Sequence, residues 1–123
     1  MRAEARALGI AVEPDLHPER GTVYRADQLE FARVGVPVVY LHEGLDVIGK
    51  PAGFGERKEN DYIAHHYHQV TDTIDPQWDL SGAVQQIELL FRVGYSVAQT
   101  ARYPRWNADA EFRAARERTL SAH

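Results

Sequence analysis

The run Val36-Pro37-Val38-Val39-Tyr40-Leu41 constrains the fold more than any other stretch of the chain. It is short, continuously apolar and rich in β-branched residues, which is typical of a strand covered on both faces in an α/β sheet. Pro37 lacks an amide donor and therefore belongs at the start of the strand. The sequence thus predicts a buried strand over residues 36–41 and a second, shorter one at Ile10–Val12.

Helical patterns flank these predicted strands. On the N-terminal side we expect a helix over Arg2–Leu8, ended by Gly9, and a short helix over Gln28–Val34 with Asp27 as its N-cap. Leu29, Phe31 and Ala32 would be its buried side. On the C-terminal side the sequence predicts helices over Lys58–His65, Leu80–Ala98 and about Asp109–Leu120. Together these elements indicate an α/β protein.

The longest predicted helix begins after a capping residue, Asp79, and carries one apolar stripe. Its members step along the chain by four and three positions: Leu80, Val84, Ile87, Phe91, Tyr95 and Ala98. Such a stripe predicts core packing, and we expect Tyr62 and Ile63 of the preceding helix to point inward as well.

Composition bounds the class of protein. A chain of 123 residues with 44% hydrophobic and 26% charged residues is typical of one soluble globular domain, here residues 1–123. A net charge of −4 without a basic stripe argues against a nucleic-acid partner. No run is long enough to predict a membrane span, and the N-terminus lacks the apolar centre of a signal peptide. The absence of cysteine excludes thiolate metal sites and cysteine nucleophiles, but it leaves the compartment open.

The chemistry-bearing residues gather between Asp61 and Asp75. Three of the six histidines stand at positions 65, 66 and 68, with Tyr67 between the last two and carboxylates at 61, 72 and 75. Imidazole and carboxylate groups are the ones that a zinc or hydrolytic site recruits. Solvated histidines at a helix end or in a loop are the alternative interpretation.

The connection from His42 to Arg57 is long and contains four glycines and Pro51. A connection of this length in a compact domain is usually functional. It places polar side chains near the predicted C-terminal end of the 36–41 strand, where α/β sheets put their sites: Tyr40, His42, Glu43, Asp46 and Lys50. The glycine spacing does not fit a phosphate-binding loop.

Several motifs occur in order along the chain. They are Tyr24-Arg25-Ala26-Asp27-Gln28-Leu29-Glu30-Phe31-Ala32-Arg33-Val34-Gly35-Val36-Pro37, Asp61-Tyr62-Ile63-Ala64, Tyr67-His68-Gln69-Val70-Thr71-Asp72, Trp78-Asp79-Leu80-Ser81-Gly82-Ala83 and Leu89-Leu90-Phe91-Arg92-Val93-Gly94. This ordered set resembles the C-terminal part of the co-catalytic, dinuclear zinc aminopeptidase family, which includes bacterial aminopeptidases, glutamate carboxypeptidase and glutaminyl cyclase. The resemblance implies the C-terminal portion of a three-layer α/β/α zinc-exopeptidase domain, with few strands flanked by helices.

The resemblance also implies roles for individual residues. In that family the histidine of a Tyr-His-x-x-x-Asp segment binds one of two zinc ions, so His68 would be a zinc ligand. Tyr67 would stabilise negative charge on the scissile carbonyl, and Asp72 would orient the turn that holds His68. Apart from these three roles, Asp27 and His42 are further candidates for lining the site. The alternatives are a loop histidine, a half-buried tyrosine wall and a turn aspartate that satisfies local amides.

The chain also departs from the family pattern. Ala26 and Gln28 stand where the family often has serine and histidine. The remaining zinc ligands of the family come from an upstream His-x-Asp, a bridging aspartate, a Glu-Glu pair and a further aspartate. This sequence contains no His-x-Asp and no Glu-Glu. One histidine cannot hold a catalytic zinc ion, which needs about three protein ligands.

These observations give two hypotheses. The first is the C-terminal piece of a zinc-dependent exopeptidase that removes N-terminal residues from peptides when complete and is inactive alone. When complete it would bind a peptide substrate, and no nucleic-acid or membrane partner is expected. Complementation by a separately encoded N-terminal half is a third possibility. The second is a non-catalytic binding or self-association module with a vestigial metal histidine. Incomplete domains expose strand edges and apolar faces, so we expect the isolated chain to associate.

Overall fold

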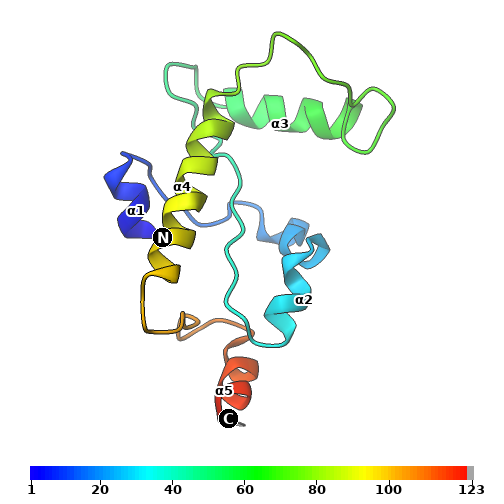
Figure 1. The fold of residues 1–123 in the computed structure, drawn as a ribbon. Coiled ribbons are helices and arrows are strands. Elements are labelled where there is room, and N and C mark those ends of the chain that lie inside the picture. Colours follow the sequence, from blue (N-terminus) through cyan, green and yellow to red (C-terminus); the bar gives the residue numbers. More distant parts are fainter. Residues whose placement is uncertain (122–123) are drawn as a thin grey trace. The chain divides into compact units, whose positions relative to one another are not determined.

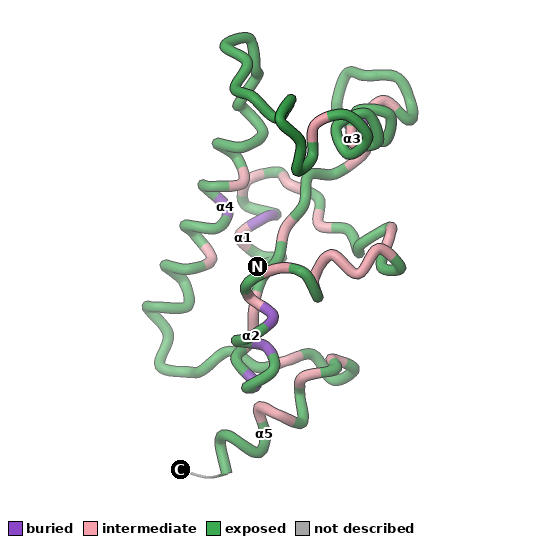
Figure 2. The backbone as a smooth tube through the Cα atoms, turned by 90° about the vertical axis from the view of Figure 1, so that its right-hand side faces the viewer, coloured by how far each residue is buried: buried purple, intermediate pink, exposed green. Residues whose placement is uncertain are grey.

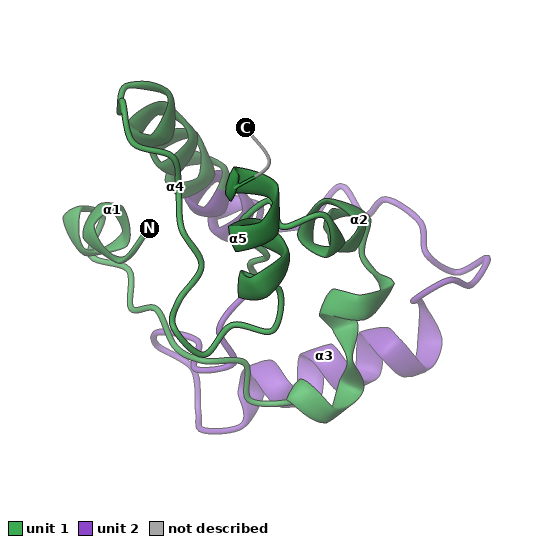
Figure 3. Ribbon diagram, turned by 90° about the horizontal axis from the view of Figure 1, so that it is seen from below, with its two compact units in different colours: residues 1–41, 87–123 green, residues 42–86 purple. Residues whose placement is uncertain are grey.

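A computed structural model describes residues 1–121 of the chain (Figure 1). Within this range the protein is helical and contains no strand. It divides into two compact units, residues 1–41 with 87–123 and residues 42–86 (Figure 3). The elements are α1 (Arg2–Ala7), the 3₁₀ turns η1 (Pro18–Arg20) and η2 (Thr22–Arg25), α2 (Gln28–Arg33), α3 (Phe54–His65), α4 (Ser81–Ala98) and α5 (Arg113–Ser121).

The predicted α/β fold is wrong, and residues 36–41 show why. The amides of Gly35 and Val36 donate to the carbonyls of Ala32 (2.8 Å) and Phe31 (3.0 Å), so they close α2 instead of starting a strand. Val36 and Val39 remain 40% and 43% exposed. A strand is stabilised by the ladder that it forms with a neighbour, and no segment of residues 1–121 supplies that neighbour. The strand predicted at Ile10–Val12 is absent for the same reason.

The first unit is held together where α5 meets the end of α2. Gly35 has φ +89°, and a Cβ atom added to it would lie 2.6 Å from the Cα atom of Arg116. The indole Nε1–H of Trp106 donates to the Gly35 carbonyl (3.0 Å), and the Thr119 hydroxyl donates to the Val34 carbonyl (3.2 Å). A residue without a side chain therefore allows this close backbone approach.

Helix α1 packs beside the part of α4 that belongs to the same unit. The hydroxyl of Ser96 on α4 donates to the Glu4 carboxylate on α1 (2.7 Å). Ala5 is fully buried, and Leu89 is 3% exposed (Figure 2). As predicted, Gly9 follows α1 in the left-handed conformation, at φ +69°. The buried side of α4 is thus the side that carries Leu89.

The apolar stripe of α4 does not form the core, which corrects the sequence-based expectation. Its large side chains are 58–68% exposed: Leu80, Val84, Ile87, Phe91 and Tyr95. Phe31, Tyr62 and Ile63 are likewise exposed. The predicted start of the helix is supported, since the Ser81 amide donates to the Asp79 carboxylate (2.9 Å). Periodicity therefore identified the helix and its stripe, but not the side that is covered.

In the second unit, α3 begins at Phe54 instead of Lys58, so part of the predicted loop is helical. Gly53 precedes it at φ +72°. Gly55 in the first turn is buried, and a Cβ atom on it would collide with the backbone of Leu45. The 42–53 connection is consequently held against the start of α3. Among residues 1–121, no helix is both long and apolar enough to cross a membrane.

Candidate functional site

The last turn of α3 and the turn that follows form a compact corner, residues 61–72, which we call the histidine corner. The carbonyl of Tyr62 accepts the amides of both His66 (2.8 Å) and Tyr67 (2.9 Å), which ends the helix. Side chains tie the turn back to α3, since the Gln69 amide group donates to the Ala64 carbonyl (3.0 Å) and the Thr71 hydroxyl to the carbonyl of His65. The corner is therefore fixed by local hydrogen bonds.

Two of its three histidines are engaged in these local contacts. The Nδ1 atom of His65 lies 3.1 Å from both the carboxylate and the carbonyl of Asp61, one helical turn earlier. The Nδ1 atom of His66 lies 2.9 Å from the Thr71 carbonyl. A ring nitrogen bonded to a carbonyl carries its proton there, so only the other nitrogen remains as a lone-pair donor. His65 and His66 thus serve the structure of the corner.

Asp72 is bonded to Tyr62 across the turn. The Tyr62 phenol donates to the Asp72 carboxylate (3.1 Å), and the Asp72 amide donates to the Gln69 carbonyl (3.0 Å). The bond to Asp72, with smaller contributions from partial desolvation and the charge of Asp72, raises the pKa of the Tyr62 phenol above 10.0. Tyr62 was expected to be an inward apolar residue, and no sequence spacing indicated its polar partner ten positions away.

Tyr67 and His68 form the exposed tip of the corner. Their rings are stacked, with centroids 3.9 Å apart and planes inclined by 20°. His68 has φ +59°, and it is the one non-glycine residue of positions 1–121 with positive φ. A side chain in this left-handed region costs conformational energy, and such residues cluster at functional sites. Sequence reasoning selected His68 from its motif and missed its backbone conformation.

The two other residues named as site-lining are outside residues 61–72, and their role beside the site stays a prediction. Asp27 belongs to the first unit, where it precedes α2, and its carboxylate makes no capping hydrogen bond. His42 belongs to the second unit but lies at its start, in the exposed connection that leads to α3. Neither is part of the histidine corner.

The corner does not fit a zinc ion by itself. A catalytic zinc site needs about three protein ligands within roughly 2.0–2.3 Å of the metal. Within positions 1–121, no group of three histidine, aspartate or glutamate side chains is arranged to hold a metal ion. His68 offers one imidazole, and the Nδ1 atoms of His65 and His66 already have partners in Asp61 and Thr71.

Residues 1–91 match the family model of Peptidase family M28, and the matched range includes the whole histidine corner. The chain therefore belongs to peptidase family M28, in agreement with the resemblance seen in the sequence. This membership assigns it to the hydrolases and peptidases at a coarse level, in a family that is generally zinc-dependent. No curated protein and no solved structure matches the chain.

Proposed function

We propose that the chain works as part of a zinc-dependent exopeptidase of the aminopeptidase type, to which it contributes the His68 imidazole. The observation that carries this proposal is the left-handed backbone of His68 at the exposed tip of a corner that is otherwise tied down by hydrogen bonds. Non-glycine residues held in this backbone region cluster at functional sites, which favours a ligand-binding role for the exposed imidazole. The match to family M28 over residues 1–91 supports the same interpretation.

In this proposal Tyr67 faces the peptide. Its phenol can donate a hydrogen bond to the carbonyl oxygen of the bond to be cleaved, where negative charge develops. Stacking against the His68 ring restricts the orientation of the phenol, so part of the ordering cost is met before the peptide binds. Asp72 acts indirectly, because its bond to Tyr62 keeps the turn that carries both rings against α3.

The same geometry leads us to propose that the isolated chain does not hydrolyse peptides. One imidazole leaves most of the coordination of a catalytic zinc ion unsupplied, and no three histidine, aspartate or glutamate side chains of residues 1–121 are arranged to hold a metal ion. A separate N-terminal half of the family domain would provide the remaining ligands and the carboxylate base. The purified chain should release no N-terminal amino acids from peptides in the presence of zinc. Chelator-sensitive release by the chain alone would overturn the proposal.

Calorimetric titration with zinc tests the role of His68 directly. We expect weak binding by the wild type and its loss in His68→Asn, because asparagine tolerates the left-handed backbone but lacks the imidazole. His65→Asn is the matched control and should bind as the wild type does. Equal binding by the wild type and His68→Asn would remove His68 from the site.

A non-catalytic module is the second candidate function. It is favoured by the exposed apolar face of α4, where five large side chains are each more than half exposed. A surface of that kind marks an interaction site. In this case mixing the chain with the missing part of a family M28 domain would restore no peptidase activity, and association would be the property that the chain retains.

A further inference from the structure

Four large apolar residues at the start of the α4 stripe follow the spacing of a two-helix seam. Leu80, Val84, Ile87 and Phe91 alternate steps of four and three, and they are 58%, 62%, 66% and 68% exposed. The same alternation continues to Gly94 and Ala98. An alternation of three and four is the repeat by which two α-helices pack along each other. We call residues 80, 84, 87, 91, 94 and 98 the α4 seam.

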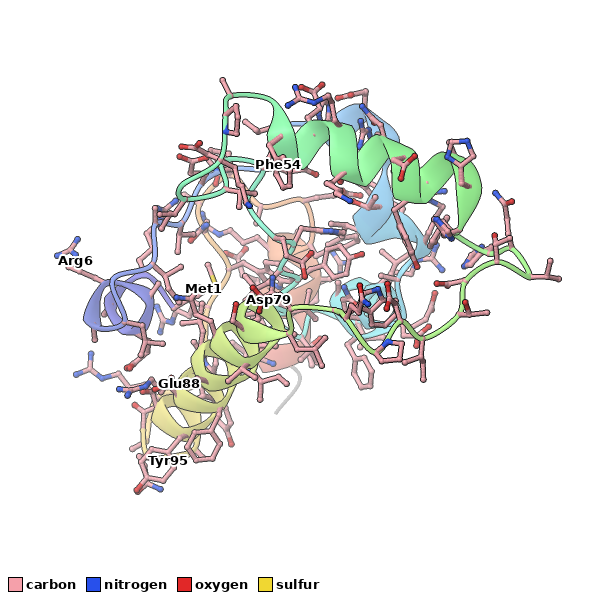
Figure 4. The ribbon with its side chains drawn as sticks, turned by 90° about the horizontal axis from the view of Figure 1, so that it is seen from above. Met1, Arg6, Phe54, Asp79, Glu88 and Tyr95 are labelled. Carbon is pink, nitrogen blue, oxygen red and sulfur yellow. The ribbon has the colours of Figure 1, made fainter. Side chains whose placement is uncertain are left out.

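The seam and the side of α4 that packs in its own unit are different sides of the helix. Leu89, which is 3% exposed, lies two positions after Ile87 and therefore about 200° around the helix from it. Ser96, which bonds to Glu4 on α1, lies near the same buried side. Figure 4 shows Tyr95 projecting away from α4 at the end opposite Asp79. The seam is thus on the exposed side of α4, away from Leu89 and Ser96.

The sizes of the seam residues change along the helix in a way that suits one particular partner. They are large at Leu80 and Phe91 and smallest at Gly94, where an added Cβ atom would meet nothing within 4 Å. If a second α4 runs antiparallel with the twofold axis between residues 87 and 88, Val84 lies opposite Phe91, and Leu80 lies within one position of Gly94. The largest seam residue then faces a smaller one, and Leu80 lies beside the space at Gly94, as side chains of facing helices do when they interdigitate.

We propose that the α4 seam binds the α4 seam of a second copy of this chain in an antiparallel, two-fold symmetric pair. The pair is isologous, so each copy uses the same residues and the contact closes on itself. This proposal does not depend on the peptidase role, because none of its residues belongs to the histidine corner.

Charge on the helix is compatible with a second copy. The charged residues of α4 are Glu88 and Arg92, and they bind each other through two contacts of 2.8 Å and 3.1 Å. In the antiparallel pair the two Glu88 side chains approach the symmetry axis, and each brings its own Arg92 as a counter-charge. Two whole chains, each with net charge −4, repel one another. Added salt screens that repulsion and should strengthen the pair.

The surface area that the seam buries sets the expected affinity of the dimer. Covering its large side chains on both helices removes on the order of 1,000 Å² of surface from water, which is at the lower end of specific interfaces. We therefore expect a reversible dimer with a dissociation constant of roughly micromolar magnitude. Sedimentation of the full chain should show that the dimer dissociates on dilution and that added salt strengthens it.

Sedimentation velocity across a concentration series tests the surface. The wild type should shift from monomer to dimer, and Ile87→Glu or Phe91→Glu should weaken dimerisation by more than about tenfold, since each buries a charge. Gln85→Glu is the matched control, because it adds the same charge to the same helix at an exposed position outside the seam, one turn before Leu89. A wild type that stays monomeric, or large aggregates that ignore the Glu substitutions, would overturn the proposal. So would a seam that binds only to the N-terminal half of a family M28 domain and never to a second copy of this chain.

The orientation has its own test. Gly94→Leu should weaken the dimer, because leucine then meets Leu80 of the other copy, and the double variant Leu80→Ala/Gly94→Leu should restore it by exchanging the large and small positions. In a parallel pair Gly94→Leu would fill a gap between equivalent positions and strengthen association, which would contradict the antiparallel arrangement. Circular dichroism of each variant confirms that α4 remains helical, so a loss of dimer cannot be confused with unfolding.

Discussion

The phenol of Tyr62 donates a hydrogen bond to the carboxylate of Asp72 at 3.1 Å, across the turn that presents Tyr67 and His68. This contact joins the last turn of α3 to the far end of the histidine corner. It shows how Asp72 can influence a proposed ligand without touching it, because the aspartate fixes the path of the backbone on which His68 stands.

The Tyr62–Asp72 bond should be visible in the alkaline titration of the protein. Asp72 raises the pKa of the Tyr62 phenol above 10.0, so the folded corner favours the protonated phenol. The stability that the bond contributes is full below pH 10 and is lost as the pH rises through the raised pKa. Spectrophotometric titration should show a late-ionising tyrosine that disappears in Tyr62→Phe and returns to the ordinary range in Asp72→Asn. Tyr24 also has a raised pKa, through its bond to Glu111, so Tyr24→Phe is the control.

Gly35→Ala should be strongly destabilising. The residue has φ +89°, and an added methyl group would lie within 2.6 Å of the backbone of α5. We expect the free energy of unfolding of the first unit to fall by about 2–4 kcal/mol, measured by urea denaturation. Gly9→Ala is the matched comparison, because Gly9 has φ +69° but open space around it. Equal losses in the two variants would mean that the close approach of α5 contributes nothing.

His68→Gly should stabilise the second unit while removing the proposed ligand. Glycine adopts positive φ without the steric cost that histidine pays, so we expect a gain of roughly 1 kcal/mol. His66→Gly should have the opposite effect, because His66 has a negative φ of −128° and its ring bonds to the Thr71 carbonyl. Thermal melts of both variants measure the difference. A loss of stability in His68→Gly would show that the imidazole holds the corner together.

Acid should weaken the start of α4 through Asp79. Its carboxylate accepts hydrogen bonds from Ser81, which lowers the pKa of Asp79 below 3.8. The contribution of this group to stability is therefore present above pH 3.8 and is lost as the pH falls through the lowered pKa. Asp79→Ala should have less helix than the wild type near neutral pH by circular dichroism, and the difference should shrink in strong acid. Asp79→Asn should retain the helix and lose the pH dependence, since an amide oxygen also accepts the bond.

Local patterns in the sequence predicted the helices well. Capping by Asp79, the 3.6-residue spacing after Leu80 and the glycine stop after α1 are each decided by residues near one another in the chain, and the structure contains the corresponding features. The motif around His68 likewise identified the family, which the match over residues 1–91 confirms.

Predictions that required a distant partner were wrong. The Val36–Leu41 run has the composition of a buried strand, but a strand is a property of at least two segments. The exposed stripe of α4 is a second example. An apolar side of a helix predicts that some surface covers it, but it does not identify that surface. The left-handed backbone of His68 arose from the hydrogen bonds of the following turn, which the residue type alone does not indicate.

The contact between Gly35 and α5 also has a consequence for synthesis on the ribosome. The Trp106 indole reaches the Gly35 carbonyl across 71 positions of chain. Residues 1–41 therefore leave the ribosome before α5 is translated, and the end of α2 stays uncovered until then. During that interval the carbonyls of Val34 and Gly35 lack the Thr119 and Trp106 donors that they have in the folded unit.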